Sequence, residues 1–238
     1  MTFIRQVRLD EKDDTHRYPF TLPVVQHLTR HPLEIRKPIT FLVGDNGAGK
    51  STLVEAIAVA AGFNAEGGSQ SFRFATKATE SSLGDYLTLS WGIKKPRTGY
   101  FLRAESFYNV ATEIDRIGDG IHASYGGKSL HERSHGESFI DLMTHRFGGR
   151  GLYVLDEPEA ALSVKGCLTV LRRMHELVDE GSQFIIATHS PILLAAPNAT
   201  ILEITDTIDE VSYDTAEPVA LTRNFLSEPD RFLRHLLD

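Results

Sequence analysis

One run of residues early in the chain has the spacing of a phosphate-binding loop. Residues 44–51 read Gly-Asp-Asn-Gly-Ala-Gly-Lys-Ser, which fits a glycine, any four residues, and then glycine, lysine and a hydroxyl residue. The glycines let the backbone curl so that its N–H groups point at phosphate oxygens. Lys50 would place a positive charge near the β- and γ-phosphates, and the Ser51 hydroxyl would ligate Mg²⁺. The run therefore predicts a site for a nucleoside triphosphate with Mg²⁺. The residues expected at the nucleotide are Gly44, Asp45, Asn46, Gly47, Ala48, Gly49, Lys50, Ser51 and Thr52.

The elements on both sides of this loop are the ones that its chemistry requires. Residues 38–43 are apolar enough for a buried strand, and residues 51–61 have the pattern of a helix that ends at Gly62. The N-terminus of that helix would direct a partial positive charge, about half an elementary charge, at the same phosphates. A glycine-rich turn that caps a helix by coincidence is the alternative, and the matching flanks argue against it.

A second chemical feature is a pair of acids at the end of an apolar strand. Residues 152–155 (Leu-Tyr-Val-Leu) lead directly into Asp156 and Glu157. Ending a buried strand with two carboxylates is costly unless cations meet them. Because consecutive side chains of an extended chain point to opposite faces, the two acids should have different roles. We assign Asp156 to Mg²⁺ and Glu157 to the attacking water as general base. A solvent-exposed acidic turn is the alternative.

Together these motifs resemble the ABC-type ATPase superfamily, in particular its soluble branch of SMC, Rad50 and RecF relatives. The run at 156–162 resembles the Walker B and D-loop sequence of that superfamily, and Ser134-His-Gly-Glu-Ser138 resembles its signature motif. His189, within Thr-His-Ser after a predicted strand, resembles the switch histidine. The order of the motifs matches from about residue 38 to 200. The resemblance implies ATP and Mg²⁺ as ligands.

Several positions depart from the pattern of the superfamily. Arg133 and His135 replace the usual leucine and first glycine of the signature, and Ser163 stands where transporter ATPases often have aspartate. No glutamine fits the Q-loop, since Gln70 follows the phosphate loop too soon. Glu105, after a predicted strand, is the candidate for that position and for a Mg²⁺ ligand through a bound water.

The resemblance also implies a dimer and an aromatic contact to the base. In ABC ATPases the signature of one subunit covers the nucleotide of the other, so Ser134, Gly136 and Glu137 would complete the site of a second copy. His189 would then contact the γ-phosphate and hold the water together with Glu157. Alternatively, Ser134 only caps its own helix. For the adenine we consider the aromatic residues at 18 and 20, for which packing in the core is an equal alternative.

Composition favours one water-soluble domain. The chain has 238 residues, a net charge of −7 with both signs interspersed, and a single cysteine, Cys167, which we interpret as a core thiol in a reducing compartment. No run approaches 18 apolar residues, and the N-terminus lacks the apolar segment of a signal peptide. We expect a cytoplasmic protein without membrane insertion.

The predicted elements define the fold class as an α/β P-loop NTPase with a mostly parallel sheet flanked by helices. An antiparallel β edge and a small helical insertion with the signature complete it. We expect one domain over 1–238, with a nucleotide-binding core at 1–82 and 148–215, a hairpin and helical insertion at 83–147, and a C-terminal helix at 216–238. The individual predictions are an edge strand at 3–9, a hairpin of strands 86–91 and 99–103, helices at 107–117, 137–147, 164–180 and 191–196, strands at 184–187, 201–205 and 210–213, and Ser227 as the cap of the last helix.

Two functions remain open at this level. The first is an ATP-hydrolysing, ATP-sandwiched homodimer that acts on a macromolecule such as DNA in repair, maintenance or defence, by analogy with its relatives. The second is the ATPase subunit of an ABC transporter with separate membrane subunits. No guanine-reading motif is present, which disfavours a GTPase. Lys94, Lys95 and Arg97 in the predicted hairpin turn could contact a nucleic-acid backbone or form a solvated turn.

Overall fold

The computed structural model describes residues 2–10, 17–69, 82–104 and 135–237. A six-stranded sheet lies at its centre, with the strand order β5-β6-β7-β3-β8-β9. The first five of these strands run parallel, and β9 is antiparallel to β8. Their bounds are Thr98–Arg103 for β5, Gly151–Asp156 for β6, Gln183–Ala187 for β7, Ile39–Gly44 for β3, Ala199–Ile204 for β8 and Ile208–Val211 for β9. The predicted fold class is confirmed.

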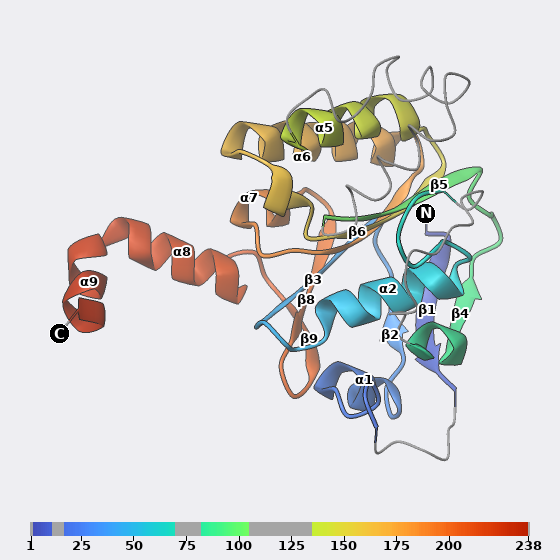
Figure 1. The fold of residues 1–238 in the computed structure, drawn as a ribbon, viewed down its shortest axis with the longest axis horizontal. Coiled ribbons are helices and arrows are strands. Elements are labelled where there is room, and N and C mark those ends of the chain that lie inside the picture. Colours follow the sequence, from blue (N-terminus) through green and yellow to red (C-terminus); the bar gives the residue numbers. More distant parts are fainter. Residues whose placement is uncertain (1, 11–16, 70–81, 105–134, 238) are drawn as a thin grey trace.

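Helices cover both faces of this sheet, which explains why its strands β3 and β6 are buried along their whole length (Figure 1). α5 (His135–Arg146), α6 (Val164–Asp179) and α7 (Pro191–Leu194) pack with Phe41 and Val43 of β3 in one core. α2 (Lys50–Ala60) packs with Leu42 in a second core on the opposite face. Successive side chains of each strand therefore enter different cores. Cys167 lies buried on α6 as a free thiol, as predicted.

A second, antiparallel sheet lies on the α2 side and has the order β2-β1-β4. Its strands are β2 (Leu33–Glu34), β1 (Ile4–Leu9) and β4 (Leu87–Trp91). The predicted edge strand at 3–9 is wrong in one respect, because β1 is the middle strand and pairs with both neighbours. The turn-rich local sequence did not reveal β2, which has only two residues.

The predicted hairpin of residues 86–103 does not form. β4 pairs with β1 in the small sheet, whereas β5 pairs in parallel with β6 in the large one. The difference lies in burial: Tyr100, Phe101 and Leu102 of β5 are at most 1% exposed and need cover on both faces, whereas most of β4 is only partly buried. Residues 92–97 therefore connect two sheets instead of closing a turn.

Other elements agree with the prediction or add to it. The remaining predicted strands and the helices at 51–61, 137–147, 164–180 and 191–196 are found within a few residues of their expected bounds. The sequence analysis missed α1 (Pro23–Leu28) and two short 3-10 helices, η1 (Ser82–Tyr86) and η4 (Pro158–Ala161). The predicted helix at 107–117 lies outside the described residues, and the domain boundaries at 82, 147 and 215 stay predictions.

The chain ends in two helices, α8 (Glu217–Ser227) and α9 (Pro229–Leu237), which we call the C-terminal arm. The prediction of one helix over 216–238 is wrong, since there are two. The final helix begins two residues after its predicted cap, Ser227. Ser227 is the last residue of α8, where its hydroxyl donates to the Asn224 carbonyl oxygen at 3.0 Å, and Pro229 opens α9. A proline favours the first turn of a helix and disfavours a helical conformation in the residue before it, so Pro229 separates the two helices.

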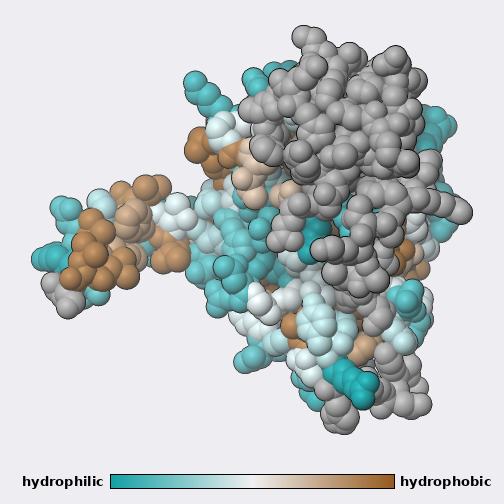
Figure 2. Space-filling view, in the orientation of Figure 1, coloured by the Kyte–Doolittle hydropathy of each residue, from teal (hydrophilic) through white to brown (hydrophobic). Residues whose placement is uncertain are grey.

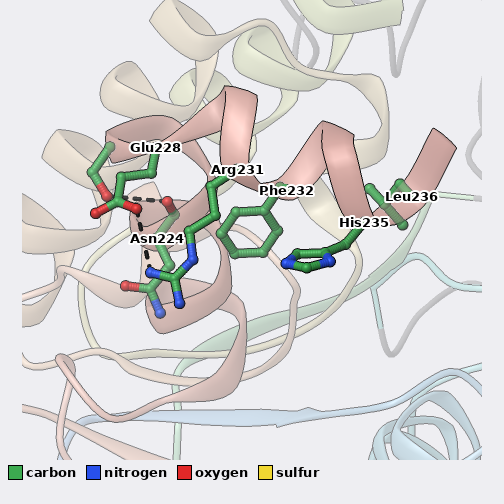
Figure 3. Close-up of a pocket in the computed structure, with 7 residues that line it drawn as sticks. Asn224, Glu228, Arg231, Phe232, His235 and Leu236 are labelled. Atoms are coloured by element: carbon green, nitrogen blue, oxygen red, sulfur yellow. Dashed lines mark hydrogen bonds and ion pairs between the residues drawn. The ribbon is translucent and has the colours of Figure 1, made fainter. Parts of the chain in front are cut away.

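The arm extends away from both sheets (Figure 1). Only Pro218 and Val219 at the start of α8 are buried, and no residue of α9 is. Figure 2 shows apolar residues over much of its surface, and Leu226, Leu236 and Leu237 are each at least 71% exposed. A pocket is lined by residues of both helices, with an ion pair of Arg231 and Glu228 at one end and Leu236 at the other (Figure 3).

No helix among the described residues has both the length and the apolar character needed to cross a membrane.

Candidate functional site

The predicted phosphate loop follows β3 and leads into α2, as the sequence pattern requires. Gly44, Gly47 and Gly49 have φ angles of 143°, 87° and 92°, a region that other residues rarely adopt. An added Cβ at Gly49 would also lie 2.7 Å from the Val24 side chain, and one at Gly44 would collide with the carbonyl oxygen of Ile204. Residues 45–47 are exposed although the strand before them is buried. The loop therefore offers its backbone to a ligand.

Lys50 lies at the base of this loop and is only 4% exposed. Its Nζ donates to the carbonyl oxygens of Gly44 and Asp45, both at 2.8 Å. Burial lowers the pKa of Lys50, and the nearby carboxylates, Glu157 foremost and then Asp156, oppose that shift. The ammonium group of Lys50 therefore interacts electrostatically with both predicted acids.

The two acids lie at the same edge of the sheet as the loop, because β6 and β3 are parallel strands with only β7 between them. Asp156 ends β6, is 4% exposed, and is in register with Ala187 of β7 and Arg103 of β5. The next residue, Glu157, has φ 48° and ψ 52°, and its N–H donates to the Ala187 carbonyl oxygen at 2.9 Å. The prediction that an extended backbone separates the two side chains is wrong, since a left-handed turn at Glu157 separates them instead.

Three of the residues predicted to hold Mg²⁺ or the attacking water, Ser51, Asp156 and Glu157, line one pocket of about 440 Å³, a size suited to a small-molecule ligand. Ser51 enters it from the first turn of α2, and the two acids enter from the end of β6. The complete lining is Ser51, Arg103, Ala104, Asp156, Glu157, Ala160 and Ala161. The structure thus brings Ser51, Asp156 and Glu157 together, although about a hundred residues of sequence separate them.

Arg103 is a site residue that the sequence analysis missed. It ends β5 at the same edge of the sheet, with its Nη1 2.7 Å from Glu55 Oε2 and its Nε 3.5 Å from Asp156 Oδ2. Glu55 lies on α2 and is itself buried. A signal was available in the sequence: residues 100–102 are an apolar run that ends in a charged residue, as residues 152–155 do.

His189 lies at the same edge of the sheet, two residues after β7. Its backbone N–H donates to Glu159 Oε1 at 2.6 Å, and Glu159 belongs to the 3-10 helix after Glu157. The ring Nε2 is buried, and no hydrogen-bond partner for it is found among the described residues. His189 does not line the pocket described above, so its contact with a γ-phosphate stays a prediction.

Two of the three signature residues can be located. Gly136 and Glu137 lie in the first turn of α5, and Glu137 is exposed. An added Cβ at Gly136 would lie 2.9 Å from the carbonyl oxygen of Ala161, which places this glycine beside a residue of the pocket. Ser134 and Glu105 lie outside the described residues, so their assignments stay predictions.

The structure separates the two aromatic candidates for an adenine contact. Phe20 is 4% exposed and packs edge-to-face on Tyr86, with ring centroids 5.3 Å apart, so it is a core residue. Tyr18 is 67% exposed, and its hydroxyl lies 3.3 Å from the Oγ1 of Thr52, directly after the phosphate loop. Tyr18 therefore remains the candidate.

The donor set fits a magnesium–triphosphate complex. No group of three or more His, Cys, Asp or Glu side chains in the described parts of the chain is arranged to hold a metal by itself. Mg²⁺ commonly binds through one or two protein oxygens and completes its shell with phosphates and water. Ser51 and Asp156 supply those oxygens beside a loop built for phosphate.

Comparisons with known proteins bear on part of the sequence and on the fold. The sequence pattern of one known family, described as an AAA domain, matches residues 25–118. No curated protein sequence matches the chain.

Among solved structures, cbiO1 from Clostridium perfringens, part of the ABC transporter complex cbiONQ, is 17% identical over 99% of this chain and 98% of its own, with a TM-score of 0.52. The SMC head domain from Thermotoga maritima is also 17% identical, over 89% of this chain and 100% of its own, with a TM-score of 0.47. The likeness to cbiO1 shows a shared fold.

The family match covers the predicted phosphate loop and α2, and the fold shared with cbiO1 agrees with the predicted resemblance to ABC-type ATPases.

Proposed function

We propose that the chain binds Mg·ATP at the carboxyl edge of its large sheet and hydrolyses it to ADP and phosphate. One observation carries the proposal: Ser51, Asp156 and Glu157 line a single pocket beside the phosphate loop and Lys50. The loop N–H groups and Lys50 bind the β- and γ-phosphates. Glu157 accepts the proton of the attacking water, and His189 holds that water from the next strand.

Ser51 and Asp156 are the residues that hold Mg²⁺ in this proposal, with Glu105 as a further candidate through a bound water. The bound ion neutralises phosphate charge. Tyr18 contacts the adenine ring from its exposed position next to Thr52.

The active form that we propose is a homodimer with two ATP molecules between its subunits. Glu137 is exposed in the first turn of α5, where a helix N-terminus favours an anion such as the γ-phosphate of a partner. With Ser134 and Gly136 it would complete the site of the second copy, in a closed two-fold arrangement.

The work of this dimer, in our proposal, is done in the cytoplasm on a macromolecule such as DNA. Lys94, Lys95 and Arg97 are exposed on the connection between the two sheets, and Lys95 Nζ lies 3.9 Å from the centre of the Trp91 ring. Cations beside an aromatic ring suit a nucleic-acid strand. ATP turnover with single-stranded DNA, duplex DNA or RNA at two salt concentrations tests this, because stimulation by a polyanion fades as salt rises. Equal turnover in all cases would reject the nucleic-acid target.

Sedimentation equilibrium with the Glu157→Gln variant tests the enzyme and the dimer together. We expect this variant to bind Mg·ATP and to shift from monomer to dimer when the nucleotide is added, since ATP stays intact between the subunits. Lys50→Ala is the matched control, which should bind too little ATP to shift. A Glu157→Gln variant that binds Mg·ATP and sediments as a monomer would contradict the sandwich.

A further inference from the structure

A cation of the protein itself already lies against the carboxylate that is expected to hold magnesium. The Nε of Arg103 is 3.5 Å from Asp156 Oδ2, and both residues line the same pocket as Ser51. The contact follows from the sheet, because Arg103 and Asp156 are register partners at the ends of the parallel strands β5 and β6. The Asp156 side chain is only 5% exposed, so a nearby positive charge offsets much of the cost of burying it.

Arg103 is held from a second direction by Glu55. Its Nη1 lies 2.7 Å from Glu55 Oε2, a shorter contact than the one to Asp156, and the Glu55 side chain is 8% exposed. Glu55 belongs to α2, the helix that begins at Lys50 of the phosphate loop. One guanidinium group thus connects the helix of the phosphate loop with the acid at the end of β6.

We propose that Arg103 is a positioning residue that occupies Asp156 as a placeholder cation and thereby sets the metal affinity of the nucleotide site. The inference rests on the proposed function, in which Asp156 is a Mg²⁺ ligand. Arg103 and a divalent cation compete for the same carboxylate. The metal must displace the Arg103–Asp156 contact, so the stronger this contact is, the weaker the metal binds. When metal arrives with ATP, Glu55 retains the guanidinium.

This arrangement predicts opposite effects for two neutral substitutions. Arg103→Gln removes the competing charge, so metal should bind more tightly. Glu55→Gln weakens the alternative partner of the guanidinium, so Arg103 should hold Asp156 more firmly and metal should bind more weakly. A role in which these residues only maintain the fold would move both variants in the same direction.

Titration with Mn²⁺, followed by its electron paramagnetic resonance signal, measures the affinity directly in the full-length chain with ATP present. We expect a Kd about tenfold lower for Arg103→Gln, because the variant removes a positive charge 3.5 Å from Asp156 Oδ2, and a Kd a few-fold higher for Glu55→Gln. Arg103→Lys, which keeps the charge, should stay near the wild-type value. Arg172→Gln, at a side chain on α6 that is 83% exposed, is the matched control and should leave the Kd unchanged.

The outcomes separate this inference from the proposed function. If the wild-type chain binds no ATP, even in EDTA, the proposed function fails. If the wild type binds ATP and Mn²⁺ but Arg103→Gln binds Mn²⁺ equally or less tightly, the placeholder role is wrong and the proposed function stands. If one of the two variants does not fold, the change in the Kd for Mn²⁺ of the other variant tests the inference. A change opposite to the predicted direction overturns it.

Discussion

Two regions of the molecule depart from the usual distribution of residues, in opposite ways. At the carboxyl edge of the large sheet, Lys50, Glu55 and Asp156 are charged and at most 6% exposed. In the C-terminal arm, leucines such as Leu226 and Leu236 are 71% exposed. Buried charges and exposed apolar groups are the informative exceptions to the rule that apolar residues lie inside.

The difference between the regions lies in what the structure provides for them. The buried charges at the sheet edge have close contacts: Lys50 donates to loop carbonyls, and Arg103 joins Glu55 to Asp156. The apolar residues of α9 have no burial in the described structure. We infer that the sheet edge is built for a ligand and is sensitive to change, whereas the arm adds little to the stability of the fold.

The largest expected effect is on catalysis at the sheet edge. Glu157→Gln keeps the size of the side chain but removes its ability to accept a proton, so we expect the turnover number to fall by roughly 10²–10⁴-fold. Steady-state ATPase assays measure it. Glu180→Gln, an exposed glutamate in the same chain, is the control and should retain the parental rate. Parental turnover in the Glu157 variant would show that another group takes the proton.

The next effect concerns the stability of the buried charges. Glu55→Ala removes the carboxylate that lies 2.7 Å from Arg103 Nη1 and should lower the free energy of unfolding by about 2 kcal/mol, the value of a hydrogen bond to a charged group. Denaturant unfolding followed by circular dichroism measures it. Glu176→Ala breaks the more exposed pairs with Arg172 and Arg173 on α6, which should together cost no more than about 1 kcal/mol. Equal losses in both variants would remove the distinction between buried and exposed charge pairs.

The smallest effect is expected in the arm. Leu236→Ala should change the free energy of unfolding by no more than about 0.5 kcal/mol, because this side chain is 71% exposed. The same substitution at Leu142 of α5, which is fully buried, should cost roughly 2–5 kcal/mol. Denaturant unfolding of the two variants side by side tests the contrast. A loss in the Leu236 variant close to that at Leu142 would mean that the arm is buried in solution and would end the comparison.

Local sequence was enough wherever neighbouring residues supply the whole feature. The strand and the helix around the predicted phosphate loop were predicted within a residue or two. The whole motif lies within eight consecutive residues, so its pattern can be read without knowledge of the fold. The central strands were also predicted, since a run such as residues 152–155 is apolar on both faces. The hairpin prediction failed because β4 and β5 differ in how completely they need cover, and a turn sequence carries no information about the partner strand.

The sequence by itself determined that this chain carries a phosphate loop, a strand ending in two acids and a histidine after a later strand, in the order of an ABC-type ATPase. Only the tertiary structure decided how these parts meet. Parallel pairing of β5 with β6 placed Arg103 against Asp156, and a left-handed backbone at Glu157 set the direction of its side chain. These contacts depend on strand register and on burial in the complete fold, which no local run of residues specifies.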